Sequence, residues 1–336
     1  MIEQTVTRLR GGHDLTRAEA REAMNEIMRG EATHAQIASF LVALRDKGET
    51  ADEIAGCAEA MREHVLVVAP QREDLVDTAG TGGDGMRTLN ISTAAALVAA
   101  AAGAGVAKHG NRAASSQTGS ADVLEALGFE LQLPPEKIAR SIDELGFGFM
   151  FAQAHHPAMR HAAPVRRELG TRTIFNILGP LTNPARARAQ VVGVYAESLV
   201  RPIAEALAQL GSHRAFVVHG AGGIDELSPV GPSVVCEVVD GGMRDLTVDP
   251  DELGIERCTV EELRGGTPAE NAAAIRRIFA GERGGKREAI LLNAAGAYAA
   301  AGHAADLREG LAAVREGLDS GAAAARLEAL VEFSRS

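Results

Sequence analysis

The stretch DTAGTGGDGMRTLNISTAAALVAAAAG, residues 77–103, decides the fold of this chain. It joins the end of a short β-branched run, LVDTAG, to an alanine-rich helical segment through a turn dense in glycine. Asn90, Ser92 and Thr93 stand where that helix should begin, and hydroxyls and free N–H groups at a helix start favour an anion. A strand, a glycine turn and a helix in succession therefore predict a phosphate-binding loop, with the acidic Asp84 in its middle.

Two familiar glycine motifs do not fit this turn. Gly80, Gly82 and Gly85 have the spacing of a dinucleotide fingerprint, but that motif needs an acidic residue about 20 positions on. No acidic residue follows before Asp122. A Walker A loop is excluded because no Gly-Lys-Ser/Thr follows. The spacing alone leaves a plain strand-to-helix turn open as the alternative.

A second polar stretch, KHGNRAASS at residues 108–116, follows a predicted strand at Val106–Ala107. Lys108 and Arg112 supply positive charge, and Gly110 lets the backbone approach a ligand closely. In open α/β sheets, ligands bind at the carboxyl ends of the strands. The two loops are therefore predicted to converge on one phosphate-rich ligand.

The chain divides into a helical start and a longer α/β part. Residues 1–69 are predicted to be helical, with Thr16 and Glu19 forming a capping box. After Pro70, β-branched runs alternate with helical patterns, which indicates a mostly parallel sheet covered on both faces. The Gly-Gly pair in CEVVDGGMRDLTV predicts one antiparallel hairpin. We predict an α/β fold with an N-terminal all-helical domain, residues 1–69, and a larger α/β domain, residues 70–336, whose mostly parallel central sheet is flanked by helices.

Composition restricts the partners. Lys and Arg number 34 against 45 Asp and Glu, a net charge of −11, which argues against nucleic acid or an anionic membrane as a partner. Cys57, Cys236 and Cys258 are far apart in the sequence, so neither a disulfide framework nor a zinc site is predicted. No signal peptide is evident, and the longest apolar stretch, residues 94–107, is shorter than the ~20 residues of a membrane span. The expected location is cytoplasmic.

Asp225 and Glu226 lie in VVHGAGGIDELSP, a glycine-rich loop after a predicted strand at residues 215–218. Adjacent carboxylates are usually solvated surface charge. Their place at the carboxyl end of a strand favours a metal site, since Mg²⁺ needs only one or two carboxylates beside waters and ligand phosphates.

Several long motifs in the chain resemble those of anthranilate phosphoribosyltransferases. They are GTGGD, NIST, KHGNR with the following SS, GSADVLEALG, PVRRELGTRTIFNILGPLTNP, DELSP and LLNAAGAY, and the helical start FLVALRDKGETADEIAG is similar as well. The resemblance covers essentially the whole chain. It implies transfer of the phosphoribosyl group of phosphoribosyl pyrophosphate (PRPP) to the amine of anthranilate, with release of pyrophosphate, in tryptophan biosynthesis.

The resemblance also implies a set of site residues. The PRPP-binding set is Gly80, Thr81, Gly82, Gly83, Asp84, Thr88, Asn90, Ile91, Ser92, Thr93, Lys108, His109, Gly110, Asn111, Arg112, Ser115, Ser116 and Ser120. The anthranilate-binding set is Gly80, His109, Asn111 and Arg166, and the magnesium ligands are Ser92, Asp225 and Glu226, for two Mg²⁺ per subunit. Lys108 is expected to act electrostatically, and no nucleophile, general acid or general base is assigned.

The family further implies a homodimer formed through the helical domain, and a return of part of residues 160–185 to that domain. Two positions depart from its pattern. Gln117 replaces a common lysine, and GAGGIDE lacks an acidic residue often found before the second glycine. His155, His156 and His161 are close in sequence, but no Cys or acidic ligand is suitably spaced for zinc.

Two other functions remain as alternatives at this point. A pyrimidine-nucleoside phosphorylase would share the fold and bind phosphate in a similar loop, but such chains are usually longer and lack KHGNR and RTIFNILGPLTNP in this form. A non-catalytic, nucleic-acid-binding relative would be expected to carry a basic face and to lack Asn111 and Arg166. Both residues are present in this acidic chain.

Overall fold

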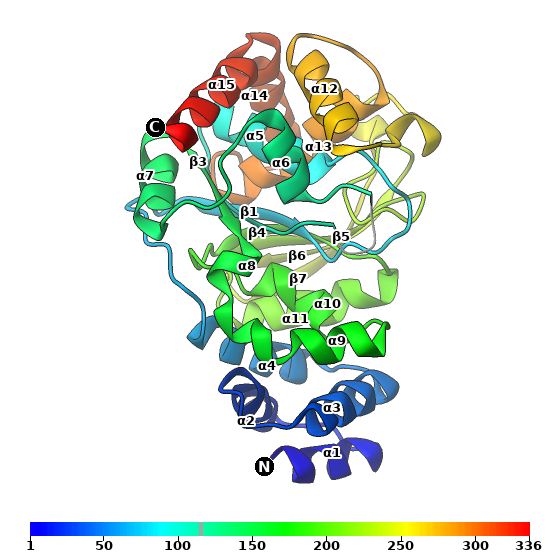
Figure 1. The fold of residues 1–336 in the computed structure, drawn as a ribbon. Coiled ribbons are helices and arrows are strands. Elements are labelled where there is room, and N and C mark those ends of the chain that lie inside the picture. The colour runs from blue at the N-terminus through cyan, green and yellow to red at the C-terminus, as the bar shows by residue number, and fades with distance from the viewer. Residues whose placement is uncertain (114–116) are drawn as a thin grey trace.

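A seven-stranded sheet crosses the middle of the molecule, with helices on both faces (Figure 1). The computed structural model describes residues 1–113 and 117–336. The strand order is β3-β2-β1-β4-β5-β6-β7; β1 to β5 are parallel, and β6 and β7 are antiparallel to their neighbours. The predicted fold class and hairpin are therefore confirmed. The strands are β1 Leu75–Gly80, β2 Gly105–Gly110, β3 Phe147–Phe151, β4 Ala189–Gly193, β5 Arg214–His219, β6 Ser233–Val239 and β7 Gly242–Val248.

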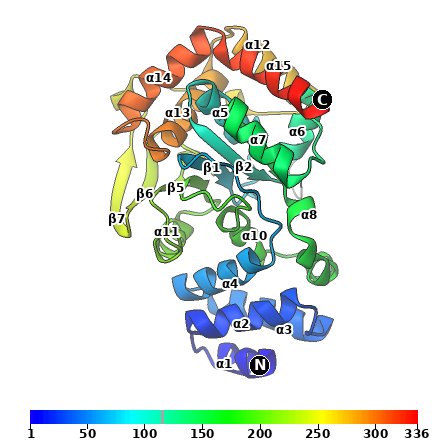
Figure 2. The same ribbon diagram turned by 90° about the vertical axis from the view of Figure 1, so that its left-hand side faces the viewer.

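One face of the sheet is covered by an aliphatic layer centred on α5 and α13, whose alanines are all buried except Ala101 at the end of α5 (Figure 2). Small side chains let these two helices pack closely on each other and on the strands. The helices of this half are α5 Ile91–Ala101, α6 Ser120–Leu127, α12 Pro268–Phe279, α13 Gly285–Ala300, α14 Leu307–Asp319 and α15 Ala322–Arg335. The helix α7 Pro135–Leu145 packs on the other face at the β2–β3 edge, where Ile138 and Ile142 join a separate small core with Ala107 and Met150. No helix in the described ranges is both long and apolar enough to cross a membrane.

The opposite face of the sheet packs on α11, and the N-terminal helices lie beyond it (Figure 1). Side chains of these helices, of residues 162–181 and of the sheet form one continuous apolar core. The predicted capping box at Thr16–Glu19 is present, and a second one forms at Thr50–Glu53. The elements are α1 Ile2–Arg10, α2 Arg17–Met28, α3 His34–Lys47, α4 Ala51–Glu63, α8 Ala152–His155, α9 Ala163–Leu169, α10 Phe175–Leu178 and α11 Val200–Gln209.

The prediction of helix through residue 69 is wrong at its end. The helix α4 stops at Glu63, and residues 64–74 are not helical. The backbone N–H of Leu66 donates to His155 O at 2.8 Å and that of Val68 to Pro184 O at 3.2 Å, so long-range bonds replace a helical ladder there. A domain boundary near residue 69, with residues 160–185 joining the helical domain, stays a proposal that this packing supports.

The order in which strands are added to the sheet reverses at β1. It moves from β1 to β2 and β3 on one side, and β4 then pairs with β1 on the other side. Ligands of open α/β sheets bind in the crevice that such a switch opens at the carboxyl ends of the strands. The glycine loop follows β1, and the loop carrying Asp225 and Glu226 follows β5, the neighbour of β4. The topology therefore brings both predicted loops to one crevice.

Candidate functional site

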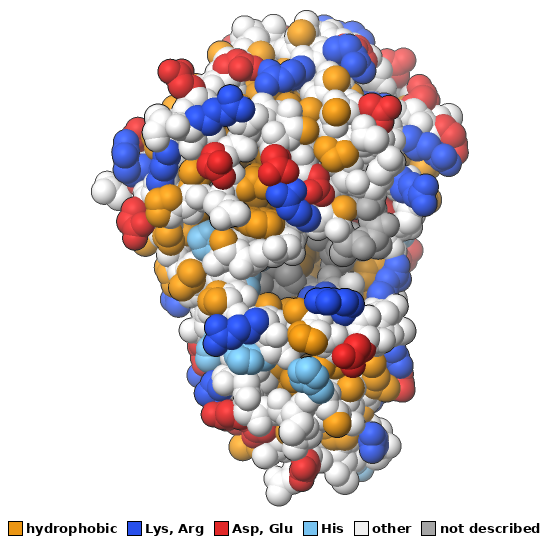
Figure 3. All heavy atoms as spheres, in the orientation of Figure 1, with side chains coloured by type: hydrophobic (Ala, Val, Ile, Leu, Met, Phe, Trp, Pro, Cys, Tyr) orange, Lys and Arg blue, Asp and Glu red, His pale blue; other side chains and the backbone are white. Residues whose placement is uncertain are grey.

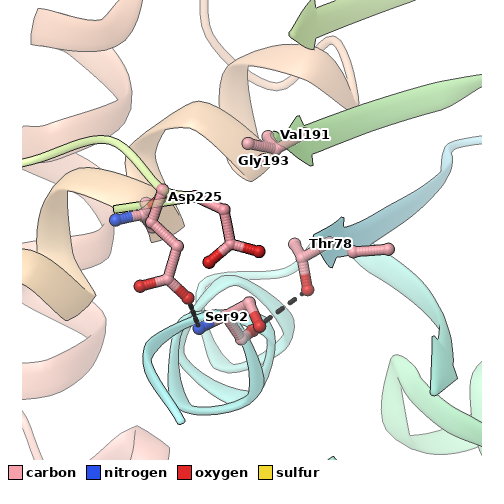
Figure 4. Close-up of a pocket in the computed structure, with 8 residues that line it drawn as sticks. Thr78, Ser92, Val191, Gly193 and Asp225 are labelled. Carbon is pink, nitrogen blue, oxygen red and sulfur yellow. Dashed lines mark hydrogen bonds between the residues drawn. The ribbon is translucent and has the colours of Figure 1, made fainter. Parts of the chain in front are cut away.

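A small cavity lies at the carboxyl ends of β1 and β4, at the switch point (Figure 4). Residues from two strands and two helices meet there with Asp225 and Glu226 of the loop after β5, called the acidic loop below. Thr78 from β1 and Ser92 from α5 are joined by a hydrogen bond of 3.0 Å, from Thr78 Oγ1 to Ser92 O. The lining residues are Thr78, Ala79, Ser92, Val191, Gly193, Asp225, Glu226 and Asn293.

The glycine loop, residues 80–90, carries unpaired backbone donors beside this cavity. Gly82, Gly83 and Gly85 have φ angles of 62°, 78° and 78°, a conformation that glycine adopts at little cost. The N–H groups of Gly83, Asp84 and Gly85 bond to no other residue in the described part of the chain. Successive free N–H groups in such a turn form an anion-binding concavity. The geometry suits a phosphate.

Three carboxylates come together in the crevice, that of Asp84 from the glycine loop and those of Asp225 and Glu226 from the loop after β5. Asp225 Oδ2 accepts from Gly82 N at 2.8 Å, Asp225 N donates to Asp84 Oδ2 at 3.4 Å, and Glu226 Oε1 accepts from the N–H of Ser92 at 2.9 Å. Burial raises the pKa of Asp225, and the charge of Asp84 adds to this. Burial also raises the pKa of Glu226, and the negative charge of Asp225 raises it further. Carboxylates held together away from water are stabilised either by a proton or by a bound cation.

The donor set fits Mg²⁺. Glu226 Oε2 is buried and has no hydrogen-bond partner among the described residues, which is costly unless a ligand satisfies it. Carboxylate and hydroxyl oxygens are hard donors of the kind Mg²⁺ prefers, and this ion retains several waters. Residues 1–113 and 117–336 contain no preformed cluster of three metal-ligating side chains, so the ligand phosphates would have to complete the coordination.

Close backbone approach fixes where Asp225 lies. A Cβ placed on Gly193, the last residue of β4, would lie 1.5 Å from Asp225 O, and one on Gly80 would lie 2.5 Å from Asp225 Oδ2. Glycine is thus required at the end of β4, where the obstructing atom is backbone, whereas a larger residue at position 80 would displace the Asp225 side chain.

The substitution Gly193→Ala should therefore displace the acidic loop. Because the obstructing atom is backbone, we expect the free energy of unfolding to fall by about 3 kcal/mol or more, as measured by urea denaturation. Gly179→Ala is the control: Gly179 has a helical φ of −50° and open space around its Cβ position. Equal stability losses in the two variants would contradict the close approach.

Two site residues escaped the sequence analysis. Thr78 lies inside β1, where the sequence pattern predicts only a buried strand residue, and it lines the cavity. Asn293 Oδ1 accepts from Leu227 N at 3.0 Å and its Nδ2 donates to Leu227 O at 2.8 Å, so it holds the acidic loop from α13. The available signal was an asparagine within the apolar helix LLNAAGAY.

The prediction that Lys108 begins a loop is wrong. The strand β2 continues to Gly110, because Lys108 and His109 pair in register with Phe149 and Met150 of β3. The Lys108 side chain is 2% exposed, and its Nζ bonds to Thr78 O and, at 3.1 Å, to Thr78 Oγ1. Burial lowers its pKa to about 8, opposed by the charges of Asp77 and Glu226. The cation thus lies beneath the glycine loop rather than in solvent.

Asp77, buried beside Lys108, yields a pH prediction. Burial raises its pKa to about 6, although Lys108, Asn183 and the N–H of His109 oppose the shift. Because this folded-state pKa exceeds the unfolded value of about 4, the stabilisation is complete below about pH 4 and is lost as the pH rises past about 6. Across that window, the free energy of unfolding of the wild type should fall by up to about 3 kcal/mol relative to Asp77→Asn. Urea unfolding at pH 4 to 7 measures this difference, and a constant difference would contradict the assignment.

Arg112 and Ser120, two further members of the predicted PRPP-binding set, make local bonds. Arg112 Nη1 pairs with Asp122 at 2.9 Å and with Glu125 at 2.8 Å, both on α6. The Ser120 hydroxyl donates to Asn111 O at 3.2 Å. Ser115 and Ser116 lie outside the described residues. The contacts expected between this loop and PRPP stay predictions.

A hollow opens at mid-height on the face in Figure 3, with basic side chains just below it. The Arg166 side chain on α9 is half-buried, and its guanidinium has no hydrogen bond or ion pair in the described part of the chain; it lies over the Phe175 ring at 5.1 Å. Burial lowers its pKa. A half-buried, unpaired guanidinium is suited to a carboxylate ligand.

His109 lies against His156, with their Nε2 atoms 3.2 Å apart, and its Nδ1 is 3.1 Å from Gly179 O. Burial lowers the pKa of His109 to about 3 and that of His156 to about 4. His155 instead bonds to Leu66 O through Nδ1 at 2.8 Å. The neighbouring residues His155 and His156 therefore bond to different partners.

Arg172 spans from the segment after α9 to the glycine loop. It donates to Gly83 O, and its guanidinium stacks on the Tyr195 ring at 4.0 Å. Its neighbour Thr171 accepts from Arg45 of α3 at 2.8 Å. The glycine loop is thus tied to the helices below it, a link that sequence analysis did not anticipate.

Comparisons with known proteins agree with this arrangement. The models described as "Glycosyl transferase family, helical bundle domain" and "Glycosyl transferase family, a/b domain" match residues 3–65 and 72–324. The anthranilate phosphoribosyltransferase of Symbiobacterium thermophilum is 53% identical over 323 residues, which cover 96% of this chain and 95% of that one. That of Moorella thermoacetica is 50% identical over 336 residues, covering 100% and 99%.

Solved structures share the fold over nearly the whole chain. The Thermus thermophilus anthranilate phosphoribosyltransferase superposes with a TM-score of 0.94 at 50% identity, with 99% of both chains covered. The Saccharomyces cerevisiae enzyme, in complex with PRPP and Mg, gives a TM-score of 0.91 at 28% identity, covering 99% of this chain and 98% of that one. The same yeast enzyme with 4-fluoroanthranilate gives 0.88 at 26% identity, with the same coverage.

The fold and the family models define a glycosyl transferase built from a helical bundle and an α/β domain. Within that class, the chain belongs to the anthranilate phosphoribosyltransferase family.

Proposed function

We infer that this protein is an anthranilate phosphoribosyltransferase. It transfers the phosphoribosyl group of PRPP to the amine of anthranilate, releases pyrophosphate and thereby serves tryptophan biosynthesis. The observation that carries this conclusion is the crevice in which the glycine loop, with free N–H groups at residues 83–85, meets the carboxylates of Asp225 and Glu226, in a chain about half identical to such enzymes over its full length.

For the donor side, we propose that the pyrophosphate lies on the glycine loop. The N–H groups of residues 83–85 are its hydrogen-bond donors, and the positive charge of Lys108 supports the loop from below. The remaining residues expected from the family, including Thr88, Ile91 and Gly110, complete the proposed PRPP set.

For the metal, we propose that Ser92, Asp225 and Glu226 hold Mg²⁺, with two ions per subunit. The unpartnered Glu226 Oε2 and the crowding of carboxylates support this assignment. Bound magnesium supplies charge neutralisation for the departing pyrophosphate.

For the acceptor, we propose that Arg166 pairs with the anthranilate carboxylate, while Gly80, His109 and Asn111 border the ring and amine. A guanidinium binds a carboxylate in a bidentate manner. With low pKa values, the His109–His156 pair is neutral at pH 7 and adds no charge that would compete with Arg166.

The chemistry requires positioning and electrostatics. The amine nitrogen forms a bond to C1 of the ribose, the bond from C1 to the pyrophosphate oxygen breaks with its electron pair leaving on oxygen, and the amine loses one proton. An aromatic amine is already neutral near pH 7, so no strong base is needed before attack. The chain's residues hold the two reactants in line and stabilise the leaving charge.

We further propose a homodimer formed through the helical domain, and a cytoplasmic location. Ala38, Ser39 and Val42 of α3 are only half-buried, which leaves a face of small residues for a second copy. The cysteines of the described chain are all free thiols, as in a reducing compartment. Sedimentation of the purified protein tests the dimer.

The function itself is tested by fluorescence. Anthranilate should be consumed only when PRPP and magnesium are both present, and a chelator should stop the reaction. Folded protein that leaves anthranilate untouched under these conditions would refute the assignment, and nucleosides with phosphate would then be the next substrates to test.

A further inference from the structure

The segment Leu263–Asn271, before and within the first turn of α12, runs alongside the end of the glycine loop. Leu89 N donates to Leu263 O at 2.8 Å, and Gly265 N donates to Arg87 O at 2.9 Å. A Cβ on Gly265 would lie 2.8 Å from the Thr88 carbonyl oxygen. The segment is therefore in close backbone contact with the loop, although no site residue was expected in it.

Asn271 connects this segment to two loops at once. Its side chain is 2% exposed; Oδ1 accepts from Gly266 N at 2.7 Å, and Nδ2 donates to Asn90 Oδ1 at 3.0 Å. Asn90 Nδ2 in turn donates to Thr118 O at 3.0 Å, and Thr118 Oγ1 donates to Gly266 O at 2.7 Å. The four residues form a closed ring of hydrogen bonds.

The directions of these bonds follow from the backbone groups at the ends of the ring. Gly266 N–H can only donate, so Asn271 must present oxygen to it, and the Thr118 carbonyl can only accept, so Asn90 must present nitrogen to it. Asn271 is then left with its NH₂ group and Asn90 with its oxygen, which is the pairing observed. Neither amide can flip without losing a buried bond.

We propose that Asn271 is a positioning residue for the PRPP side of the site. It fixes the start of α5 through Asn90 and the residues just before α6 through Thr118. The two segments therefore keep a constant spacing before the ligand binds. Both polar atoms of the Asn90 side chain are engaged in this ring, so that side chain orients the helix start. The proposal rests on the proposed function, because it takes these loops to hold PRPP.

The ring leaves the acceptor side untouched. Arg166 and the His109–His156 pair share no bond with it. Loss of Asn271 should therefore weaken PRPP binding selectively, whereas general destabilisation would affect both substrates alike.

The test compares Asn271→Ala with Asn25→Ala in steady-state kinetics. Asn25 is a similarly buried asparagine, 5% exposed, that bonds to Glu63 and His64 within the helical domain. A lost buried bond is worth about a factor of ten or more. We expect the KM for PRPP to rise about tenfold or more in Asn271→Ala, and the KM for anthranilate to change less than about threefold. Asn25→Ala should change neither, and equal shifts of both KM values in Asn271→Ala would overturn the proposal.

Asn271→Asp separates the two bonds. Its oxygen still accepts from Gly266 N, but it no longer donates to Asn90 Oδ1. The variant should retain the raised KM for PRPP, and wild-type behaviour would refute the link through Asn90.

Hydrogen exchange without any ligand distinguishes failure of this proposal from failure of the proposed function. In Asn271→Ala, backbone amides of residues 87–92 and 117–120 should exchange faster than in the wild type or Asn25→Ala. Unchanged exchange there, with active wild-type enzyme, overturns the positioning role alone. Faster exchange in an inactive wild-type background supports the ring while the substrate assignment fails.

Discussion

Asp225→Asn combined with Glu226→Gln should raise the magnesium concentration for half-maximal activity by about tenfold or more. The amides keep an oxygen for the N–H groups of Gly82 and Ser92 that now bond to the carboxylates. They lose the negative charge that makes these side chains magnesium ligands. The crevice should therefore keep its shape and lose its affinity for the ion, which a magnesium titration at saturating PRPP and anthranilate measures.

Thermal melting provides a readout that does not require activity. Without metal, the double variant should melt at a higher temperature than the wild type, because burial and mutual repulsion make these carboxylates costly. With magnesium and pyrophosphate, the wild type should gain stability and the variant should not. The matched control is Asp251→Asn with Glu252→Gln, an adjacent acidic pair that is exposed. An unchanged magnesium titration in the site variant would remove both residues from the metal site.

The glycine loop and the acidic loop could be predicted because local residue order fixes them. A strand, a turn with positive φ and a helix start are encoded within residues 75–93, and parallel strands bring such turns to one edge. The strand β3 was missed because FGFMF is short, contains glycine and shows no alternation of polar and apolar side chains. Its identity as a strand depends on pairing with β2, which is long-range information.

Buried polar residues were the other limit. Lys108 looked like a loop residue because a lysine inside a central strand is rare, yet Thr78 and Asp77 satisfy and balance it. Asn293 and Asn271 act on segments 66 and 181 residues away, and no local pattern states such a partner. Sequence patterns thus predict candidate ligand-binding residues more readily than they predict the residues that hold those side chains in place.

Arg166→Ala should raise the KM for anthranilate by about a hundredfold and that for PRPP by less than about threefold, because a charge-assisted bidentate pair is worth about 3 kcal/mol. Arg166 has no ion pair within the described chain, and its contact with Phe175 contributes only about 0.5–1 kcal/mol. The variant should therefore fold normally, which makes its kinetic loss interpretable.

Arg167→Ala is the internal control for this prediction, since Arg167 is the exposed neighbour on the same helix. It removes an equal charge from α9 without touching the buried position, so both KM values should stay at the wild-type level. Arg166→Lys refines the test: a lysine keeps the charge but not the planar fork, and should recover only part of the anthranilate affinity. If Arg166→Ala raised both KM values equally, or if Arg167→Ala reproduced its effect, the guanidinium would act through the general field of α9 and not as the carboxylate partner.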